Sequence, residues 1–443
     1  MPWTIPFISI ILALRLTMPF SIVFPPAARE SDSENDAAMR PGAALDRELP
    51  HTAFDFVNSI GLNTHLNYFD RLYGSFPLVE RELKRVGVRH LRDGIHLQNS
   101  DYNNMLYGRW AQLGKLGIRF DAVLDPRNKL GPLSGAMLDH VNELADHTIE
   151  SFEGPNEMDI SNEPDWPSVD ERYQEEIFHA ARSMQEANPI AIIGPSLAFA
   201  SKSAQLGNLS SFMDEGNLHP YPGGQMPSVV FPDQVNLERV ICDGEPIVIT
   251  ESGYHNAINE QHDQPGVSEA AAAKYIPRLF LEDFARGIPR TYLYEFLDET
   301  PNPSLTNPQM HWGLIRADGS EKPAFFALKN MIEELNDSSE PARVRPLSWS
   351  LNRMDAEIHH LLLEKANGTY DLVLWQEVSS YDVKRHVDLD HPARSVTLTL
   401  ERAARTVTAY EPVMQAAPIR TWTQVKSVPL AIPDHPLVVE ISF

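Results

Sequence analysis

Cysteine is almost absent from this chain of 443 residues, which contains only Cys242. A single cysteine excludes an intrachain disulfide and any cysteine-rich metal site. Positive charge is also scarce, because 37 Lys and Arg residues stand against 61 Asp and Glu residues, for a formal net charge of -24. Nucleic acids and anionic membranes bind to basic surfaces, so neither is expected as a partner. A strongly anionic polymer is disfavoured as a substrate for the same reason, unless a local basic pocket compensates.

Long apolar runs are missing as well, apart from the stretch Ile5 to Val23. Arg15 interrupts this stretch, and the charged segment that normally opens a signal peptide is absent before it. We expect residues 1–28 to form a secretory signal peptide or an anchor, with an ordinary apolar tail or an upstream start-site error as alternatives. Residues 29–50 are acidic and poor in large apolar side chains, which predicts a linker. The expected location is secreted or periplasmic, in a bacterium.

Short β-branched runs alternate with helix-like stretches from Ala53 onward, which is typical of βαβ units and a parallel sheet. The candidate strands cover residues 53–63, 88–96, 118–124, 149–153, 191–196, 217–221, 247–250 and 290–296. A barrel of roughly 250–300 residues with a smaller module suits the chain length. We therefore predict an α/β fold in which residues 51–338 form a (β/α)8 TIM barrel. A doubly wound sheet is the alternative, but no Gly-x-Gly-x-x-Gly follows the first strand.

The pattern changes beyond the segment Asp337 to Pro341, where period-two runs follow one another without a helix. Several short strands separated by turn residues predict an all-β sandwich domain over residues 342–443. The expected strands cover residues 361–363, 370–375, 395–400, 406–410 and 438–443. We expect this domain to pack on the barrel, with sugar binding as the alternative role.

One candidate strand ends abruptly on a carboxylate. Ile247 to Thr250 is a β-branched run that follows Pro246 and is followed by Glu251. In a (β/α)8 barrel, catalytic groups lie at the C-terminal ends of strands. A glutamate is costly to bury at such a position and adds nothing to packing, which favours a functional role. The alternative is a structural carboxylate paired with Arg92.

A second carboxylate follows the fourth candidate strand, in the sequence Phe152-Glu-Gly-Pro-Asn-Glu157. Hydrolysis of a glycosidic bond needs an acid that protonates the leaving oxygen and a carboxylate that stabilises the oxocarbenium-like transition state. The two carboxyl groups must then differ in pKa, so that one is protonated and the other ionised near neutral pH. Glu157 and Glu251, at two strand ends of one barrel mouth, meet this requirement.

An Asn-Glu pair after strand four and a glutamate that ends strand seven resemble the retaining glycoside hydrolases of clan A. The resemblance covers most of the barrel, and His311 to Pro323 is similar to the stretch before the last helix in several clan families. Within the clan, the chain loosely resembles the family of β-xylosidases and exopolysaccharide-cleaving hydrolases. The resemblance implies that Glu157 is the acid/base and Glu251 the nucleophile, with no cofactor and no metal.

The same resemblance implies roles in substrate binding. Asn156 matches the clan residue that binds the hydroxyl group next to the reacting carbon, and Arg92 matches the arginine that contacts the nucleophile. His219-Pro-Tyr221 resembles the strand-six segment whose aromatic hydroxyl touches the same carboxylate. For Arg92 a salt bridge at the barrel mouth is the alternative, and for His219 a hydrogen-bonded core histidine.

Other candidates for substrate binding lie near the expected strand ends. His65 follows the first strand, and the flat apolar faces of aromatic side chains suit pyranose rings. The aromatic candidates are Tyr294, Phe296, Trp166 and Trp312. The alternative for each aromatic residue is a place in the core.

The sequence departs from the clan pattern at one point. Clan members usually have Asn-Glu-Pro, whereas Met158 follows Glu157 here, and the triplet Asn162-Glu163-Pro164 occurs a few residues later. Glu157 is preferred because Glu163 is too far beyond the strand 149–153 to lie at its mouth. Glu163 stays the alternative acid/base.

The sequence thus predicts a retaining glycoside hydrolase that cleaves O-glycosidic bonds of an oligo- or polysaccharide by double displacement. Carbohydrate is the expected partner, and the sugar and its linkage stay open. The alternatives are a non-catalytic carbohydrate-binding barrel, a transglycosylase using the same site, and a metal-dependent barrel hydrolase. The last has little support, because His65, His96 and His255 lack a ligand spacing such as His-x-x-x-His.

Overall fold

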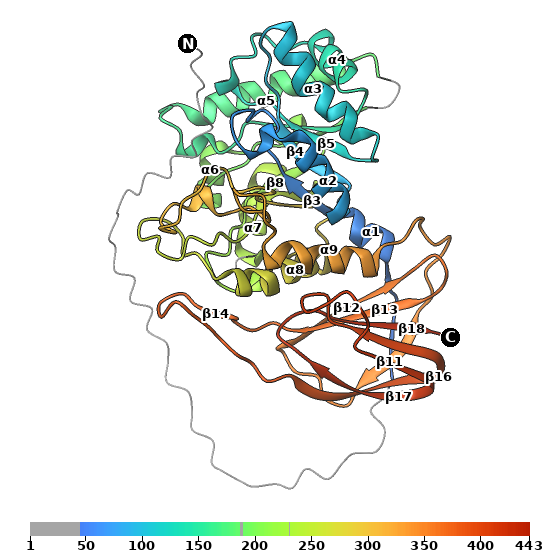
Figure 1. Cartoon of the computed structure of the whole chain (residues 1–443). Helices are drawn as coiled ribbons and strands as arrows, with labels where there is room; N and C mark the ends of the chain where they lie inside the picture. The colour runs from blue at the N-terminus through green and yellow to red at the C-terminus, as the bar shows by residue number, and fades with distance from the viewer. Residues whose placement is uncertain (1–44, 187–188, 230) are drawn as a thin grey trace.

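A computed structural model of the chain describes residues 45–186, 189–229 and 231–443 (Figure 1). The expected signal peptide or anchor, residues 1–28, lies outside the described residues, as does most of the expected linker. Within the described ranges, no helix combines the length and the apolar character that crossing a membrane requires.

An eight-stranded parallel barrel forms the larger part of the molecule, as the sequence predicted. Its strands are β3 (Ile60–Asn63), β4 (His90–Gly94), β5 (Arg119–Val123), β6 (Ile149–Glu153), β7 (Ala191–Ile193), β8 (Gly216–Leu218), β9 (Ile247–Ser252) and β10 (Thr291–Leu293). They hydrogen-bond in the order β7, β6, β5, β4, β3, β10, β9, β8. A parallel bridge between Ile193 and Glu215 joins the two ends and closes the barrel.

A helix follows each barrel strand. The helices of the described part are α1 (Ala53–Asn58), α2 (Phe76–Val86), α3 (Ser100–Gly114), α4 (Gly135–Leu144), α5 (Trp166–Arg182), α6 (Ser203–Leu206), α7 (Phe231–Cys242), α8 (Glu269–Ala285) and α9 (Pro323–Leu335). In α2 the buried residues Val79, Leu83 and Val86 recur at the spacing of one helix face. Gly87 ends this helix at φ 84°, a left-handed conformation that glycine adopts without steric cost.

The first predicted strand was wrong over half its length. The sequence predicted a strand over residues 53–63, whereas residues 53–58 form α1 and only residues 60–63 form β3. The Thr52 side chain caps the helix by accepting a hydrogen bond from Asp55 N at 2.9 Å. Phe56 and Val57 are both buried because α1 lies between the barrel and the C-terminal domain. Adjacent apolar residues in such a short helix mimic a buried strand.

The C-terminal part is an all-β domain, as predicted. Its large sheet contains β1 (Asp46–Glu48), β2 (His51–Thr52), β11 (Leu347–Leu351), β12 (Ile358–Glu364), β13 (Tyr370–Gln376), β16 (Arg394–Tyr410), β17 (Arg420–Ile432) and β18 (Leu437–Ser442), with a separate pair β14 (Tyr381–Asp382) and β15 (Val387–Asp388). The strands β1 and β2 precede the barrel in the chain. Residues 46–48, assigned to the linker from sequence, therefore pair with β11 in this domain.

Two further details of the β domain differ from the sequence prediction. Residues 395–400 and 406–410 belong to one long strand, β16, whose pairing with β17 is interrupted between Thr399 and Ala404. Strand β17 was missed, because Pro429 and a mostly exposed face weaken its strand pattern. Since β17 pairs only with β16, it lies at an edge, where a proline is tolerated.

The β domain packs against the barrel through helices α8 and α9, which lie between the two in Figure 1. One face of its sheet belongs to the same apolar cluster as the barrel helices. The residues of this face are Leu361, Leu363, Val373, Trp375 and Val438. A second apolar cluster, with Trp349, Leu372 and Val407 among its members, fills the interior of the β domain. The two domains are therefore joined by continuous apolar packing.

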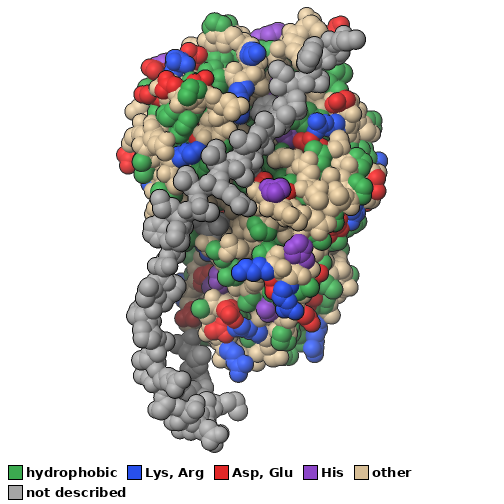
Figure 2. Space-filling view, turned by 90° about the vertical axis from the view of Figure 1, so that its left-hand side faces the viewer, with side chains coloured by type: hydrophobic (Ala, Val, Ile, Leu, Met, Phe, Trp, Pro, Cys, Tyr) green, Lys and Arg blue, Asp and Glu red, His purple; other side chains and the backbone are tan. Residues whose placement is uncertain are grey.

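The surface carries charges of both signs. Figure 2 shows Lys and Arg side chains interspersed with Asp and Glu side chains on the face that it draws. A broad basic area is not visible on that face, which agrees with the excess of acidic residues in the sequence.

A buried ion pair connects the barrel to the β domain. Arg278 on α8 is 0 % exposed, and its Nε donates to Glu377 Oε2 of the β domain at 2.8 Å. The same guanidinium also donates to Ser380 Oγ at 3.3 Å and to the carbonyl oxygen of Asp434 at 3.2 Å. The Arg278 guanidinium thus donates hydrogen bonds to three residues of the β domain.

We expect Arg278→Ala to lower the free energy of unfolding by roughly 3–5 kcal/mol, because it leaves the Glu377 carboxylate buried without its partner. Chemical denaturation followed by circular dichroism measures this change. Arg385→Ala is the control, since Arg385 is exposed and lies 4.0 Å from Asp382, and its effect should stay below about 0.5 kcal/mol. Equal effects of the two substitutions would contradict a stabilising role for the buried pair.

Candidate active site

Polar side chains from four barrel strands meet at the C-terminal end of the barrel. Asn63 ends β3, Arg92 lies in β4, Glu153 ends β6, and Glu251 is the penultimate residue of β9. Parallel strands of a closed barrel direct their carboxyl ends to one mouth, so residues far apart in sequence become neighbours there. The sequence predicted this meeting for Arg92 and Glu251.

Arg92 is the centre of the hydrogen-bond network at this mouth. Its Nε and Nη2 donate to the two carboxylate oxygens of Glu153 at 2.6 and 2.7 Å, a two-point contact that fixes the guanidinium plane. Nη1 donates to Glu251 Oε1 at 2.6 Å and to Asn63 Oδ1 at 2.9 Å. Nη2 also donates to Asn156 Oδ1 at 2.6 Å. One buried cation therefore orients two carboxylates and two amides.

Glu157 follows β6 in a conformation that is unusual for its residue type. Its φ is 49°, in the left-handed region that costs a non-glycine residue of order 1 kcal/mol. The backbone is held there because Glu157 N donates to Ser196 O at 3.0 Å, while Asn156 forms a parallel bridge with Ser196. This turn directs the Glu157 carboxylate towards His219, whose Nδ1 lies 2.8 Å from Glu157 Oε1.

His219 lies between the two glutamates predicted from sequence. Its Nδ1 also lies 3.7 Å from Glu251 Oε2, and its Nε2 lies 2.9 Å from Thr250 Oγ1. The single hydroxyl proton of Thr250 is directed to Asn217 Oδ1 at 2.7 Å, so its oxygen accepts from His219. Both imidazole nitrogens can then donate, which favours the imidazolium form. Burial alone would lower the pKa of His219, but Glu251 and Glu157 outweigh it and raise the pKa.

The two glutamates have pKa values shifted in opposite directions. Burial raises the pKa of Glu157, and the nearby Glu251 charge adds to this shift although His219 opposes it. Burial would raise the pKa of Glu251 too, but the charges of His219 and Arg92 and the hydroxyl of Tyr221 hold that pKa below its ordinary value. Tyr221 donates to Glu251 Oε2 at 2.7 Å. Glu157 is therefore the carboxyl group that keeps its proton more readily.

The two carboxylates are close to each other. One oxygen of Glu157, one oxygen of Glu251 and a ring nitrogen of His219 all lie within 4.8 Å of one another. Glu157 and Glu251 are only 7 % and 8 % exposed, so both are shielded from bulk water. Glu163, the alternative acid/base, is exposed, and its carboxylate accepts a hydrogen bond from Asp165 N in the following loop.

The remaining predicted substrate-binding residues form an aromatic wall beside Glu251. The Trp312 ring lies 5.0 Å from the ring of Tyr221 and 5.8 Å from that of Tyr294, measured between centroids. His65 is part of the same wall, with Nε2 3.3 Å from the Tyr294 hydroxyl. Two other aromatic candidates do not join the wall. Phe296 is fully buried in the barrel core, and Trp166 packs in a separate apolar cluster.

Several residues of this site had no predicted role. Glu153 holds the guanidinium of Arg92, and Thr250 and Asn217 link His219 to Glu153, since Thr250 Oγ1 lies 3.1 Å from Glu153 Oε1. Glu295, next to Tyr294, was also missed. Glu153 ends β6 and Glu295 follows β10, and that position was the signal available in the sequence, whereas Asn217 and Thr250 lie within β8 and β9.

Solved glycosidases have a fold similar to this chain. A monomeric β-xylosidase from Caulobacter crescentus matches with a TM-score of 0.55 and 12% identity, over 89% of this chain and 97% of that chain. A glycoside hydrolase family 39 enzyme from Xanthomonas axonopodis pv. citri matches with a TM-score of 0.54 and 15% identity, over 89% and 96% of the two chains. A glucosidase from Croceicoccus marinus matches with a TM-score of 0.60 and 11% identity, over 89% and 97%.

No family model and no curated protein sequence matches the chain. At the low identities of the solved structures, the similarity confirms the fold: a TIM barrel followed by a β domain.

We expect His219 to be protonated at a pH where the buried His255 is neutral. Burial lowers the pKa of His255 to about 4, whereas the pKa of His219 is raised above its usual value. The variant Glu157→Gln removes one of the carboxylates that raise it, so the His219 pKa should fall. Titration of the histidine ring signals by NMR measures both values, with His255 as internal control. An unchanged His219 pKa in the variant would show that Glu157 does not stabilise the imidazolium.

Proposed function

We propose that this protein is a retaining glycoside hydrolase in which Glu157 is the general acid/base and Glu251 the nucleophile. The observation that carries the proposal is the close, buried pair of carboxyl groups whose pKa values are shifted in opposite directions. Retaining glycosidases hold their two carboxyl groups at about 5–5.5 Å, whereas inverting enzymes need roughly 6.5–9.5 Å to admit a water molecule. A separation below 4.8 Å between oxygens favours the retaining arrangement.

In the first step Glu251 attacks the anomeric carbon of the bound sugar while Glu157 donates its proton to the glycosidic oxygen. The bond between that oxygen and the anomeric carbon breaks, and a covalent glycosyl-enzyme forms. Arg92 and Tyr221 each bind one oxygen of Glu251, which holds the carboxylate ionised and aimed. His219 contacts both glutamates and compensates the negative charge that Glu157 acquires on losing its proton.

In the second step Glu157, now ionised, removes a proton from water, and the water oxygen attacks the anomeric carbon. The bond to Glu251 breaks, and the sugar leaves with its original anomeric configuration. Asn156 Oδ1 accepts a hydrogen bond from Arg92, and this contact supports a role for Asn156 in binding the sugar hydroxyl next to the reacting carbon. The Trp312 and Tyr294 rings offer apolar surface to the sugar ring.

The similar solved structures add support. They are named as β-xylosidases and a glucosidase, and each shares both the barrel and the β domain of this chain. We infer by this likeness that the substrate is a β-linked neutral sugar chain. Transfer of the glycosyl group to another sugar in place of water is the second candidate, because it uses the same two carboxylates.

A metal-dependent hydrolase is separable from this proposal by experiment. Glu157, His219 and Glu251 place one ligand atom each within 4.8 Å of one another, which is the observation that this alternative rests on. A ligating histidine must present an unprotonated nitrogen, whereas the raised pKa of His219 favours the protonated ring. Activity that survives prolonged treatment with a strong chelator would exclude the metal-dependent reaction.

We expect Glu251→Gln to lower kcat/KM by more than roughly 1000-fold, because the nucleophile is lost. Glu157→Gln should impair activity by roughly 100–10000-fold, least on aryl glycosides, whose leaving groups need little protonation. Azide should restore part of the activity of Glu157→Gln by forming a glycosyl azide with retained configuration. Glu163→Gln, at the exposed alternative position, is the control and should leave activity unchanged. Loss of activity in Glu163→Gln with little effect in Glu157→Gln would reverse the assignment.

We also expect a bell-shaped dependence of kcat/KM on pH. Activity requires ionised Glu251, whose pKa is lowered, and protonated Glu157, whose pKa is raised. Activity should therefore rise as the pH passes above the Glu251 pKa and fall as it passes above the Glu157 pKa. Arg92→Met removes a cation that lowers the Glu251 pKa, so the acidic limb should move to higher pH. An acidic limb at the same pH in the variant would show that Arg92 does not lower the pKa of Glu251.

A further inference from the structure

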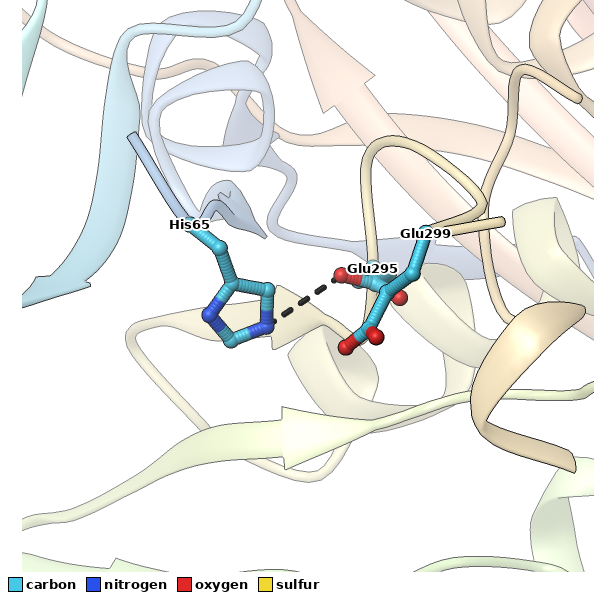
Figure 3. A group of neighbouring side chains, drawn as sticks. All are labelled: His65, Glu295 and Glu299. Atoms are coloured by element: carbon cyan, nitrogen blue, oxygen red, sulfur yellow. Dashed lines mark ion pairs between the residues drawn. The ribbon is translucent and has the colours of Figure 1, made fainter. Parts of the chain in front are cut away.

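Two groups of ionisable side chains adjoin the glutamate pair. One contains His65, Glu295 and Glu299 (Figure 3), and its charges are already paired. His65 Nε2 forms an ion pair with Glu295 Oε2 at 3.2 Å, drawn as the dashed line in Figure 3, and Arg71 contacts Glu299. The other group lies beyond the ends of β5 and β6, next to Glu157, and the mechanism proposed above gives it no role.

This other group is an ion pair between Asp125 and Arg127. Asp125 follows β5 and caps the short 3-10 helix η2 (Pro126–Asn128), because its Oδ1 accepts from Arg127 N at 2.8 Å. The Arg127 guanidinium folds back onto the same carboxylate, with Nε donating to Oδ1 at 2.8 Å and Nη2 donating to Oδ2 at 2.6 Å. Asp125 is 0 % exposed, so the guanidinium is held against a buried partner by a two-point contact.

The ion pair binds both backbone groups of one residue in the loop after β6. Strands β5 and β6 are neighbours in the barrel, and their backbone contact extends to the hydrogen bond from Leu124 N to Glu153 O at 2.9 Å. Farther along the chain, Asp125 Oδ2 accepts from Asn156 N at 3.1 Å, and Arg127 Nη2 donates to Asn156 O. The two side chains therefore connect the loops where the strands have ended.

The carbonyl group that Arg127 binds belongs to the peptide unit between Asn156 and Glu157. The N–H of the same unit donates to Ser196 O at 3.0 Å. The orientation of this unit sets φ of Glu157, which is 49°, in a region that disfavours residues with a side chain. Rotation of the unit to a negative φ would break its bonds to Arg127 and Ser196 together. These bonds thus keep the backbone in the conformation that directs the Glu157 carboxylate to His219.

The contact pattern requires the shape of a guanidinium. Nη2 of Arg127 donates to Asp125 and to Asn156, while Nε donates to Asp125, and a planar fork presents these donors together. A lysine ammonium carries the same charge on a single nitrogen and cannot reproduce this fork. An ordinary surface ion pair contributes little to structure. This pair differs because its carboxylate is buried and because both of its members bind the backbone of the loop that carries Glu157.

We propose that Arg127, held by Asp125, is a positioning residue for the acid/base Glu157. This inference rests on the proposed function and deepens it, because it adds a residue that controls proton transfer through Glu157. In the first step the Glu157 proton moves to the glycosidic oxygen as the bond to the anomeric carbon breaks, and in the second step the carboxylate takes a proton from water. Both transfers need the carboxyl group within hydrogen-bond reach of the oxygen concerned. The attack by Glu251 does not depend on the peptide unit that Arg127 binds.

The test compares phenyl and 2,4-dinitrophenyl glycosides, each prepared as the β-xyloside and as the β-glucoside. Phenolate needs a proton to leave, whereas dinitrophenolate leaves without one, and kcat/KM reports the step in which it leaves. Arg127→Lys keeps the charge beside Asp125 and removes the fork. We expect its kcat/KM to fall by roughly 10–100-fold on the phenyl glycoside and by less than about 3-fold on the dinitrophenyl glycoside. Arg127→Met should give the same pattern with a larger loss.

Azide provides a second readout, because it attacks the glycosyl-enzyme without the help of a base. It should raise kcat of the Arg127 variants on the dinitrophenyl glycoside and leave kcat of the unmodified protein unchanged. The matched control is Lys202→Met. Lys202 Nζ lies 3.3 Å from Asp159 Oδ2 and also donates to Asp159 O, so it is a cation that binds the same loop two residues beyond Glu157. Its removal should leave the activity ratio of the two glycosides unchanged.

Losses of equal size on the two glycosides in the Arg127 variants would overturn this inference, since a smaller folded fraction lowers both activities alike. A change of the ratio in Lys202→Met as large as that in Arg127→Lys would overturn it as well. The failure of the proposed function is a different result: no hydrolysis of these glycosides by the unmodified protein, or full activity in Glu251→Gln. A leaving-group effect in Glu157→Gln without one in the Arg127 variants would preserve the proposed function and reject the role of Arg127.

Discussion

The guanidinium of Arg92 is the constraint on which the candidate site depends. It is 5 % exposed and binds Glu153 and Glu251, and it also donates to Asn63 and Asn156. These partners come from three other strands, so the cation fixes the relative positions of four strand ends at the barrel mouth. Two carboxylates around one cation leave the group with an excess of negative charge. That excess keeps the arginine charged despite burial. The charges of Glu251 and Glu157 favour a second cation, His219, nearby.

His219 contributes to the difference in pKa between Glu157 and Glu251. Glu251 receives hydrogen bonds from Arg92 and Tyr221 and is near His219, so its charged form is the stabilised one. Glu157 interacts with His219 alone among these cations and lies beside the charge of Glu251, so burial dominates and favours its protonated form. The same imidazolium then faces Glu157 when the proton has left. His219 thus contacts Glu157 both when that acid is protonated and when it is ionised. This follows from the position of His219 between Glu157 and Glu251.

Much of this site could be predicted from sequence because parallel strands bring their C-terminal ends together. Glu251 and Glu157 were located by strand patterns and by a resemblance, and their contacts with Arg92 and His219 agree with the expected neighbourhood. Glu295 was not found, because its burial arises when the segment around Trp312 folds over it, and no local pattern encodes that long-range contact. The prediction of the fold was wrong for similar reasons. Helix α1 is short and has adjacent apolar residues, and the edge strand β17 contains a proline. In both elements the local sequence pattern favours a different structure from the one that tertiary packing imposes.

The β domain also contributes to the geometry of the barrel mouth. Glu377 of this domain binds Arg278 of α8 through Oε2, and its Oε1 accepts a hydrogen bond at 3.1 Å from the backbone N–H of Ser228. Ser228 belongs to the loop that follows Tyr221, and in the same loop a Cβ at Gly224 would lie 2.6 Å from Val383 of the β14–β15 arm. Gly224 also has φ 77°, so both its conformation and its close contact require glycine. The loop beyond the tyrosine that binds Glu251 is therefore held by the second domain. A barrel separated from that domain would lose the contacts of Ser228 and Gly224 with Glu377 and Val383, so the conformation of the loop that follows Tyr221 depends on both domains.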